Sequence, residues 1–165
     1  MNCKPQLLTV IAVAALTLGS AGAFAQSGAT AKLYCHSVGA SPPEALGDRE
    51  GHAITVGEFT CRVEGGATDG GVLIGTTIYE WDKGSATMLS GIGVTRKPGA
   101  TTAYQHTEGK QSLVMTDGKV TGATGSGRGR YTMATGAAAV NNGKTYSYTF
   151  RTTAPGQFIV EVKND

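Results

Sequence analysis

The sequence predicts an all-β protein built as a single antiparallel up-and-down β-barrel of about eight strands. Short segments rich in Val, Thr, Ile and Tyr recur every 10–15 residues or so, as in all-β proteins. Hairpin signals such as Asp117-Gly118 and Asn142-Gly143 separate them, and no amphipathic stretch of ten helical residues follows residue 26. Because adjacent hairpins dominate and no long crossover is evident, we expect a barrel rather than a sandwich.

Four strands are expected in the first half of this domain. Residues 31–38 form the first, before a polar, proline-containing loop at 41–51. Residues 53–64 alternate well between apolar and polar side chains, which indicates a strand with one buried face. Segments 72–82 and 85–95 follow, the first ended and the second interrupted by glycine.

Five more strand-like segments follow. Residues 101–108 are polar on both faces, and 110–116 end at an Asp-Gly hairpin. The strand after that hairpin is glycine-rich and runs to about residue 135. Residues 136–140 are strand or loop, because five residues do not make a stable helix. Segments 144–151 and 157–163 alternate clearly and complete the predicted barrel.

The glycine-rich stretch 118–136 is the segment around which we expect the barrel to be organised. It holds six of the 25 glycines in the 165-residue chain, interspersed with residues that suit strands. Glycine in a strand lets the backbone bend or approach a neighbouring strand closely. We therefore predict that this strand curls the sheet toward closure.

Residues 1–25 have the pattern of a secretory signal peptide. Lys4 supplies positive charge, residues 7–18 are a twelve-residue apolar run, and Ala-Phe-Ala ends at position 25. The run is shorter than the roughly 20 residues of a spanning helix, although an uncleaved anchor is the alternative. We predict a mature chain of one domain, 26–165, without a membrane span and periplasmic or secreted.

Two cysteines remain in the predicted mature chain, Cys35 and Cys61, and an even count in an exported protein predicts a disulfide bond. Leu33 lies on the same strand face as Cys35, and Phe59 and Val63 on the same face as Cys61, so both should point inward. Closing this loop would stabilise the fold by roughly 3.5 kcal/mol in the chain-entropy model. A pair of metal ligands is the alternative, but the chain has no supporting Cys/His spacing.

Composition argues against several function classes. The formal net charge is +2, and +2 − 1 = +1 without Lys4, which is too small to indicate nucleic-acid binding. Alternating glycines at 125–129 lack the following helix that a phosphate loop needs. His36 and His52 have no ligand spacing to each other. We therefore expect no nucleic acid, metal or cofactor.

Glu80 and Asp82 are the candidate catalytic residues. They share one strand face about 7 Å apart. Two such carboxylates can divide acid and base roles when their environments separate their pKa values. The alternative is a solvated strand end with Trp81 packed inward.

Two further groups of polar residues share strand faces. Tyr104, His106 and Glu108 would bring a histidine beside a carboxylate, which suits proton transfer. An exposed polar edge strand is the alternative. Arg128 and Arg130 could hold an anionic group, although such arginines more often face solvent.

Tyr146, Tyr148 and Phe150 are the candidate ligand-binding residues. They share one face of a strand, which we expect to point into the barrel because the opposite face is polar. Glycine-rich neighbouring strands leave room opposite them for either tight ring packing or a cavity. The rings therefore predict a filled core or a pocket for a lipid-like or aromatic molecule.

The run from Gly127 to Gly136, GRGRYTMATG, resembles the G-x-G-x-Y/F-x-x-A-x-G stretch of the allene oxide cyclase and dirigent barrels. The chain also resembles small exported bacterial proteins of that shape. The resemblance implies an eight-stranded antiparallel barrel and a homo-oligomer, since plant members are often trimeric. It transfers no catalytic or pocket residue to this chain.

Three functions follow from these patterns. The first is an exported, non-catalytic barrel that binds a small apolar ligand or a partner protein. The second is a cyclase- or isomerase-like enzyme. The third is a structural envelope protein with a filled barrel. The inner volume separates them: an open, aromatic-lined barrel favours the first, an open barrel with a buried carboxylate the second, and a filled barrel the third.

Overall fold

The computed structural model describes residues 30–39 and 43–165. The predicted signal peptide, 1–25, lies outside the described residues. Within the part of the chain that is described, no helix is long and apolar enough to cross a membrane.

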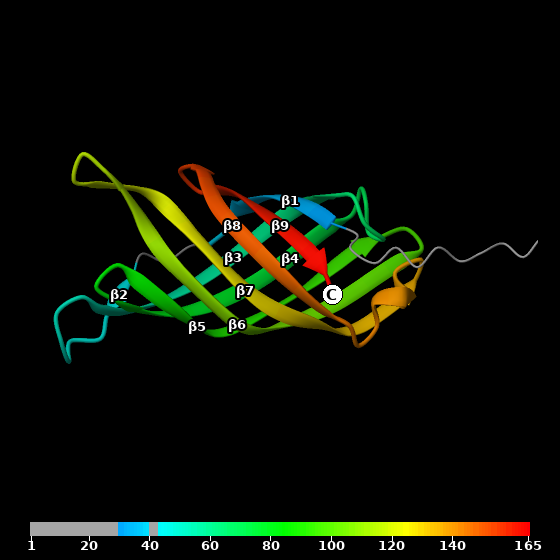
Figure 1. The fold of residues 1–165 in the computed structure, drawn as a ribbon, viewed down its shortest axis with the longest axis horizontal. Coiled ribbons are helices and arrows are strands. Elements are labelled where there is room, and N and C mark those ends of the chain that lie inside the picture. Colours follow the sequence, from blue (N-terminus) through cyan, green and yellow to red (C-terminus); the bar gives the residue numbers. More distant parts are fainter. Residues whose placement is uncertain (1–29, 40–42) are drawn as a thin grey trace, which may run out of the picture.

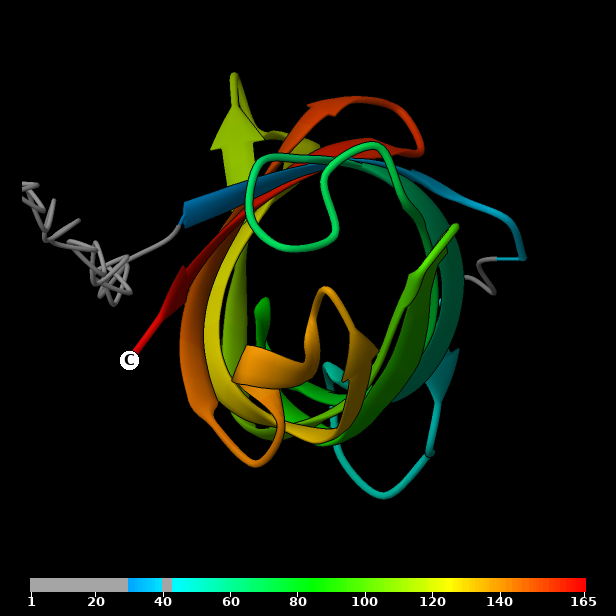
Figure 2. The same cartoon turned by 90° about the vertical axis from the view of Figure 1, so that its right-hand side faces the viewer.

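Eight strands form one closed antiparallel ring (Figures 1 and 2), as the sequence predicts. From β3 onward each strand pairs with the next, and β1 closes the ring by pairing with both β9 and β3. The ring strands are β1 (Thr30–Ser37), β3 (His52–Glu64), β4 (Val72–Asp82), β5 (Ser85–Lys97), β6 (Ala100–Thr116), β7 (Lys119–Gly136), β8 (Thr145–Ala154) and β9 (Gln157–Asn164).

Two short elements lie outside the ring order. β2 (Glu44–Ala45) pairs with the start of β3 as an extra strand. A single 3-10 turn, η1 (Ala139–Asn141), lies at one end of the barrel (Figure 2). The segment 136–140 therefore forms no strand of its own: Gly136 ends β7, and a turn leading into η1 follows.

The predicted segments 101–108 and 110–116 form one continuous strand, β6, which reduces nine expected strands to eight in the ring. Gly109 does not end the strand because it pairs directly with Gly127 of β7. The register between β6 and β7 shifts near His106 and Glu108, so the strand bends without breaking.

Aromatic rings and glycines pair across the inner face of the barrel. A glycine lacks Cβ, so the ring of its cross-strand neighbour can lie over the backbone. A Cβ at any of these glycines would collide with its partner's ring. The five pairs are Phe59–Gly75, Tyr104–Gly93, Phe150–Gly125, Tyr148–Gly127 and Tyr146–Gly129.

The disulfide prediction is supported by the position of both cysteines. Cys35 and Cys61 are direct cross-strand partners in β1 and β3, and their Sγ atoms lie 2.04 Å apart, the distance of a disulfide bond. Both are buried in the core with Leu33 and Val63, as the strand faces predict.

Candidate functional site: the barrel interior

A cavity of about 420 Å³ occupies the barrel interior. All eight ring strands contribute to its wall, and Asn141 of η1 lines it at one end. The strand alternation that packs one face inward thus leaves a space that the side chains do not fill. Its aromatic lining consists of Phe59, Tyr79, Trp81, Tyr104, His106, Tyr131, Tyr146, Tyr148, Phe150 and Phe158.

The predicted ligand-binding residues of β8 line this cavity. Tyr146 and Tyr148 are buried, with 3% and 6% of their surface exposed, and Phe150 is half-buried. All three point inward by strand alternation, and their β7 partners are glycines, which leave space for the rings. The structure therefore brings the three together at the cavity wall.

A polar centre lies among these rings. The hydroxyl of Tyr146 and Nδ1 of His106 are 3.2 Å apart, within hydrogen-bonding distance. The His106 ring also packs beside that of Tyr148, with 4.6 Å between ring centroids. Burial lowers the pKa of His106 to about 4. Its imidazole is therefore neutral at neutral pH.

The Tyr148 hydroxyl is a buried polar group without a hydrogen-bond partner, the single such side-chain group in the described parts of the chain. The Tyr79 hydroxyl is near enough to influence its pKa, yet no hydrogen bond of ordinary geometry joins the two. Burial, above all, raises the pKa of Tyr148, so the hydroxyl keeps its proton. It is a protonated hydrogen-bond donor on a residue that lines the cavity.

The remaining cavity tyrosines are also protonated. Burial raises the pKa of Tyr131 to about 12 and raises the pKa values of Tyr79 and Tyr104. The Tyr131 hydroxyl donates to Oδ1 of Asn164 at 3.0 Å, which fixes its direction. Trp81 points inward, as predicted, and donates from Nε1 to the Thr55 hydroxyl at 3.0 Å.

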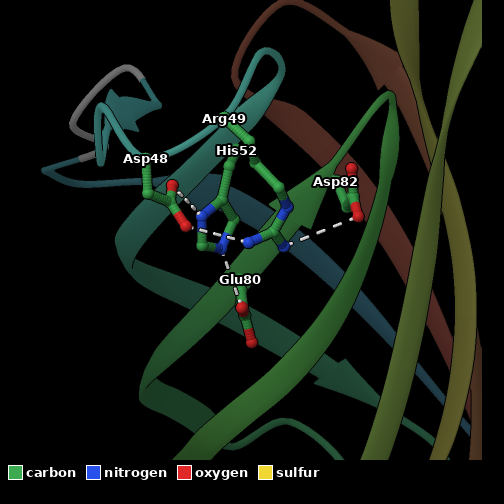
Figure 3. A network of polar contacts seen from close by, with 5 residues as sticks. All are labelled: Asp48, Arg49, His52, Glu80 and Asp82. Atoms are coloured by element: carbon green, nitrogen blue, oxygen red, sulfur yellow. Dashed lines mark hydrogen bonds and ion pairs between the residues drawn. The ribbon is translucent and has the colours of Figure 1, made fainter.

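Glu80 and Asp82 lie on the outer face of the barrel, away from the cavity (Figure 3). Nε2 of His52 contacts Oε1 of Glu80 at 2.8 Å, while Nη2 of Arg49 contacts Oδ2 of Asp82 at 3.5 Å. The two carboxylates share a face, as predicted, but each contacts a different side chain, His52 or Arg49. They are placed to anchor the loop that carries Arg49.

His52 is the centre of this outer cluster. Its Nδ1 lies 2.5 Å from Oδ1 of Asp48, and its side chain is only 8% exposed. The hydrogen bond with Asp48, followed by that with Glu80, raises the pKa of His52. The same contact lowers the pKa of Asp48. Sequence spacing did not reveal this cluster, because Glu80 is far from His52 along the chain.

The predicted grouping of Tyr104, His106 and Glu108 on one face is wrong. The register shift between His106 and Glu108 turns Glu108 outward, while Tyr104 and His106 stay inside. Glu108 instead lies 3.6 Å from Nε of Arg128 on the exposed outer surface. Arg130 is exposed as well, so neither arginine reaches the cavity.

Charge is scarce along the cavity wall. Among the described residues that line it, Glu58 is the one side chain charged at neutral pH, and it is exposed. No Lys or Arg is among them. No group of three His, Cys, Asp or Glu side chains in the described ranges is arranged to hold a metal ion.

Searches of protein-family models, curated proteins and solved structures found no match to this chain. The resemblance to allene oxide cyclase and dirigent barrels stays a prediction.

Proposed function

We propose that this protein is an exported barrel that binds a small apolar ligand in its interior without catalysing a reaction on it. The observation that carries the proposal is the cavity of about 420 Å³ with its largely aromatic wall. Small-molecule sites are typically concave, apolar spaces of roughly 300–1,000 Å³ with a few polar groups that orient the ligand. Both the size and the lining of this cavity fall in that class.

The orphaned Tyr148 hydroxyl supports binding over a purely structural role. A buried polar group without a partner costs folding free energy, so a core selected for stability alone would favour Phe at this position. A ligand that accepts a hydrogen bond from the hydroxyl would remove that cost. The outward position of Glu80 and Asp82 gives no support to acid–base chemistry on a molecule inside the barrel.

Export is supported by the cysteine pair. Two cysteines at disulfide distance suit an oxidising compartment such as the periplasm or the extracellular space. This agrees with the signal-like pattern of residues 1–25, and N-terminal sequencing of secreted protein should begin at Gln26.

The binding proposal is tested with N-phenyl-1-naphthylamine, an uncharged apolar dye that fluoresces when it leaves water. Wild-type protein, refolded from denaturant to remove any retained molecule, should bind it saturably. Gly57→Leu should weaken binding at least about tenfold, because Gly57 lines the cavity and a side chain there projects into the space.

The matched control is Thr87→Leu, which adds a leucine to the exposed outer face of β5 and should bind the dye like wild type. Absence of saturable binding to folded wild-type protein would contradict the proposed function. Equal binding by wild type and a folded Gly57→Leu variant would place the dye outside the cavity and would contradict it as well.

A further inference from the structure

The cavity wall offers no positive charge to a bound molecule. The basic side chains of the neighbouring strands, such as Lys110, Arg128 and Arg130, are exposed and absent from the lining. His106 is half-buried and neutral, with Nδ1 at hydrogen-bonding distance from the Tyr146 hydroxyl. Burying an anion without a cationic partner is strongly unfavourable.

The single formal charge among the described lining residues is negative. It belongs to Glu58, which is exposed. The lining therefore supplies no charge that could compensate a bound anion.

The hydrogen-bonding groups of the interior point to a donor role for the protein. The tyrosine hydroxyls keep their protons, and those of Tyr131 and Tyr146 already have partners on the protein. The Tyr148 hydroxyl is buried, protonated and unpartnered in the described structure. The hydroxyl oxygen is buried and the whole residue is only 6% exposed, so bulk water does not satisfy it.

The Tyr148 hydroxyl oxygen cannot change its position without moving the ring. The ring lies over Gly127, its cross-strand partner, and the hydroxyl end also lies beside Gly109. His106 packs against it on another side. The donor is thus held in one position before any ligand arrives, which lowers the entropic cost of recognition.

We propose that the ligand is an uncharged, largely apolar molecule with one oxygen, such as a ketone or ester carbonyl, that accepts a hydrogen bond from Tyr148. Carboxylates of the same size, free fatty acids included, are excluded. This inference rests on the proposed binding function and deepens it by naming the ligand class.

Three probes with one carbon skeleton test the class: 2-acetylnaphthalene, 2-ethylnaphthalene and 2-naphthoate. They carry a carbonyl, no oxygen and a carboxylate, respectively. Equilibrium dialysis against the refolded protein measures each dissociation constant at pH 7.5. We expect 2-acetylnaphthalene to bind about 3- to 10-fold more tightly than 2-ethylnaphthalene, the value of one hydrogen bond. Binding of 2-naphthoate should be at least about tenfold weaker than that of the ketone.

Two variants locate the donor. Tyr148→Phe keeps the ring and should remove the advantage of 2-acetylnaphthalene while leaving binding of 2-ethylnaphthalene unchanged. Tyr79→Phe removes the neighbouring hydroxyl and should keep the advantage. Because Tyr148→Phe deletes only one oxygen, it is expected to fold like wild type, and circular dichroism verifies this.

The outcomes separate this inference from the proposed function. Equal or tighter binding of 2-naphthoate, or an unchanged ketone advantage in Tyr148→Phe, overturns the ligand class while binding in the cavity stands. Failure of all three probes and of N-phenyl-1-naphthylamine overturns the proposed function and the ligand class together.

Discussion

Tyr148 of β8 and Gly127 of β7 are direct cross-strand partners, and the tyrosine ring occupies the space that a side chain at Gly127 would need. A Cβ at position 127 would lie within 2.7 Å of Cζ of Tyr148 and would also collide with the Glu108 carbonyl oxygen. The glycine therefore positions the ring that carries the unpartnered hydroxyl. The same relationship recurs at Tyr146 with Gly129 and at Phe150 with Gly125.

Gly127→Ala should lower the free energy of unfolding by about 1–3 kcal/mol, because the new methyl group is forced against both a ring and a backbone carbonyl. Gly57→Ala is the matched control. It is also a strand glycine of the inner wall, but its Cβ would meet only the Thr77 hydroxyl at an ordinary 3.6 Å. Urea denaturation measures both variants. Equal midpoints for the two alanine variants would show that ring packing does not require Gly127.

Tyr148→Phe should raise the stability of the ligand-free protein by roughly 1 kcal/mol, because it deletes a buried hydroxyl that has no partner. Tyr146→Phe is the control, since its hydroxyl pairs with His106 and its loss should be neutral or destabilising. Thermal melts of both variants without ligand give the comparison. A lower melting temperature for Tyr148→Phe would mean that the hydroxyl has a stabilising partner in solution.

Replacing both cysteines, Cys35→Ala with Cys61→Ala, should cost roughly 3.5 kcal/mol, because the bond closes a loop of 26 residues in the unfolded chain. Denaturation of the double variant and of wild type, each with and without reductant, measures the loss. Reductant should affect wild type alone. Two free thiols in folded protein kept under oxidising conditions would contradict the bond.

His106 should make the barrel less stable in acid. Its pKa is about 4 in the folded protein and near 6.5 when unfolded, so the unfolded state binds more protons between these values. The free energy of unfolding is therefore at its full value above pH 6.5. It falls as the pH drops toward 4, by on the order of 3 kcal/mol. The His106→Gln variant should lack this loss of stability between pH 6.5 and pH 4. An NMR titration that places the His106 pKa near 6.5 would refute it.

His52 should have the opposite effect on how the stability of the barrel depends on pH. Asp48 and Glu80 raise its folded pKa above 6.5, despite the opposing charge of Arg49 and the partial burial of the ring. The contribution of His52 to the free energy of unfolding is fully present below pH 6.5 and is lost as the pH rises through its folded pKa. The stability difference between wild type and His52→Gln should therefore shrink from pH 6 to pH 9. A difference that grows over this range would reverse the assignment.

Much of the fold could be predicted from the chain because strand alternation is a local property. The faces of Cys35 and Cys61, and the inward direction of Tyr146, Tyr148 and Phe150, follow from the two-residue period and agree with the structure. The period fails where a strand bulges: Glu108 leaves the face of His106 because the register with β7 shifts between them.

The sequence by itself determined the closed antiparallel barrel, the cysteine pairing and the inward direction of Tyr146, Tyr148 and Phe150, since each depends on alternation and turn signals within short segments. Tertiary structure alone decided which glycine lies under which ring, how Asp48 and Glu80 meet at His52, and how much space remains inside. These features depend on the register of strands far apart in the chain. A shift of one residue there would turn Tyr148 away from the cavity.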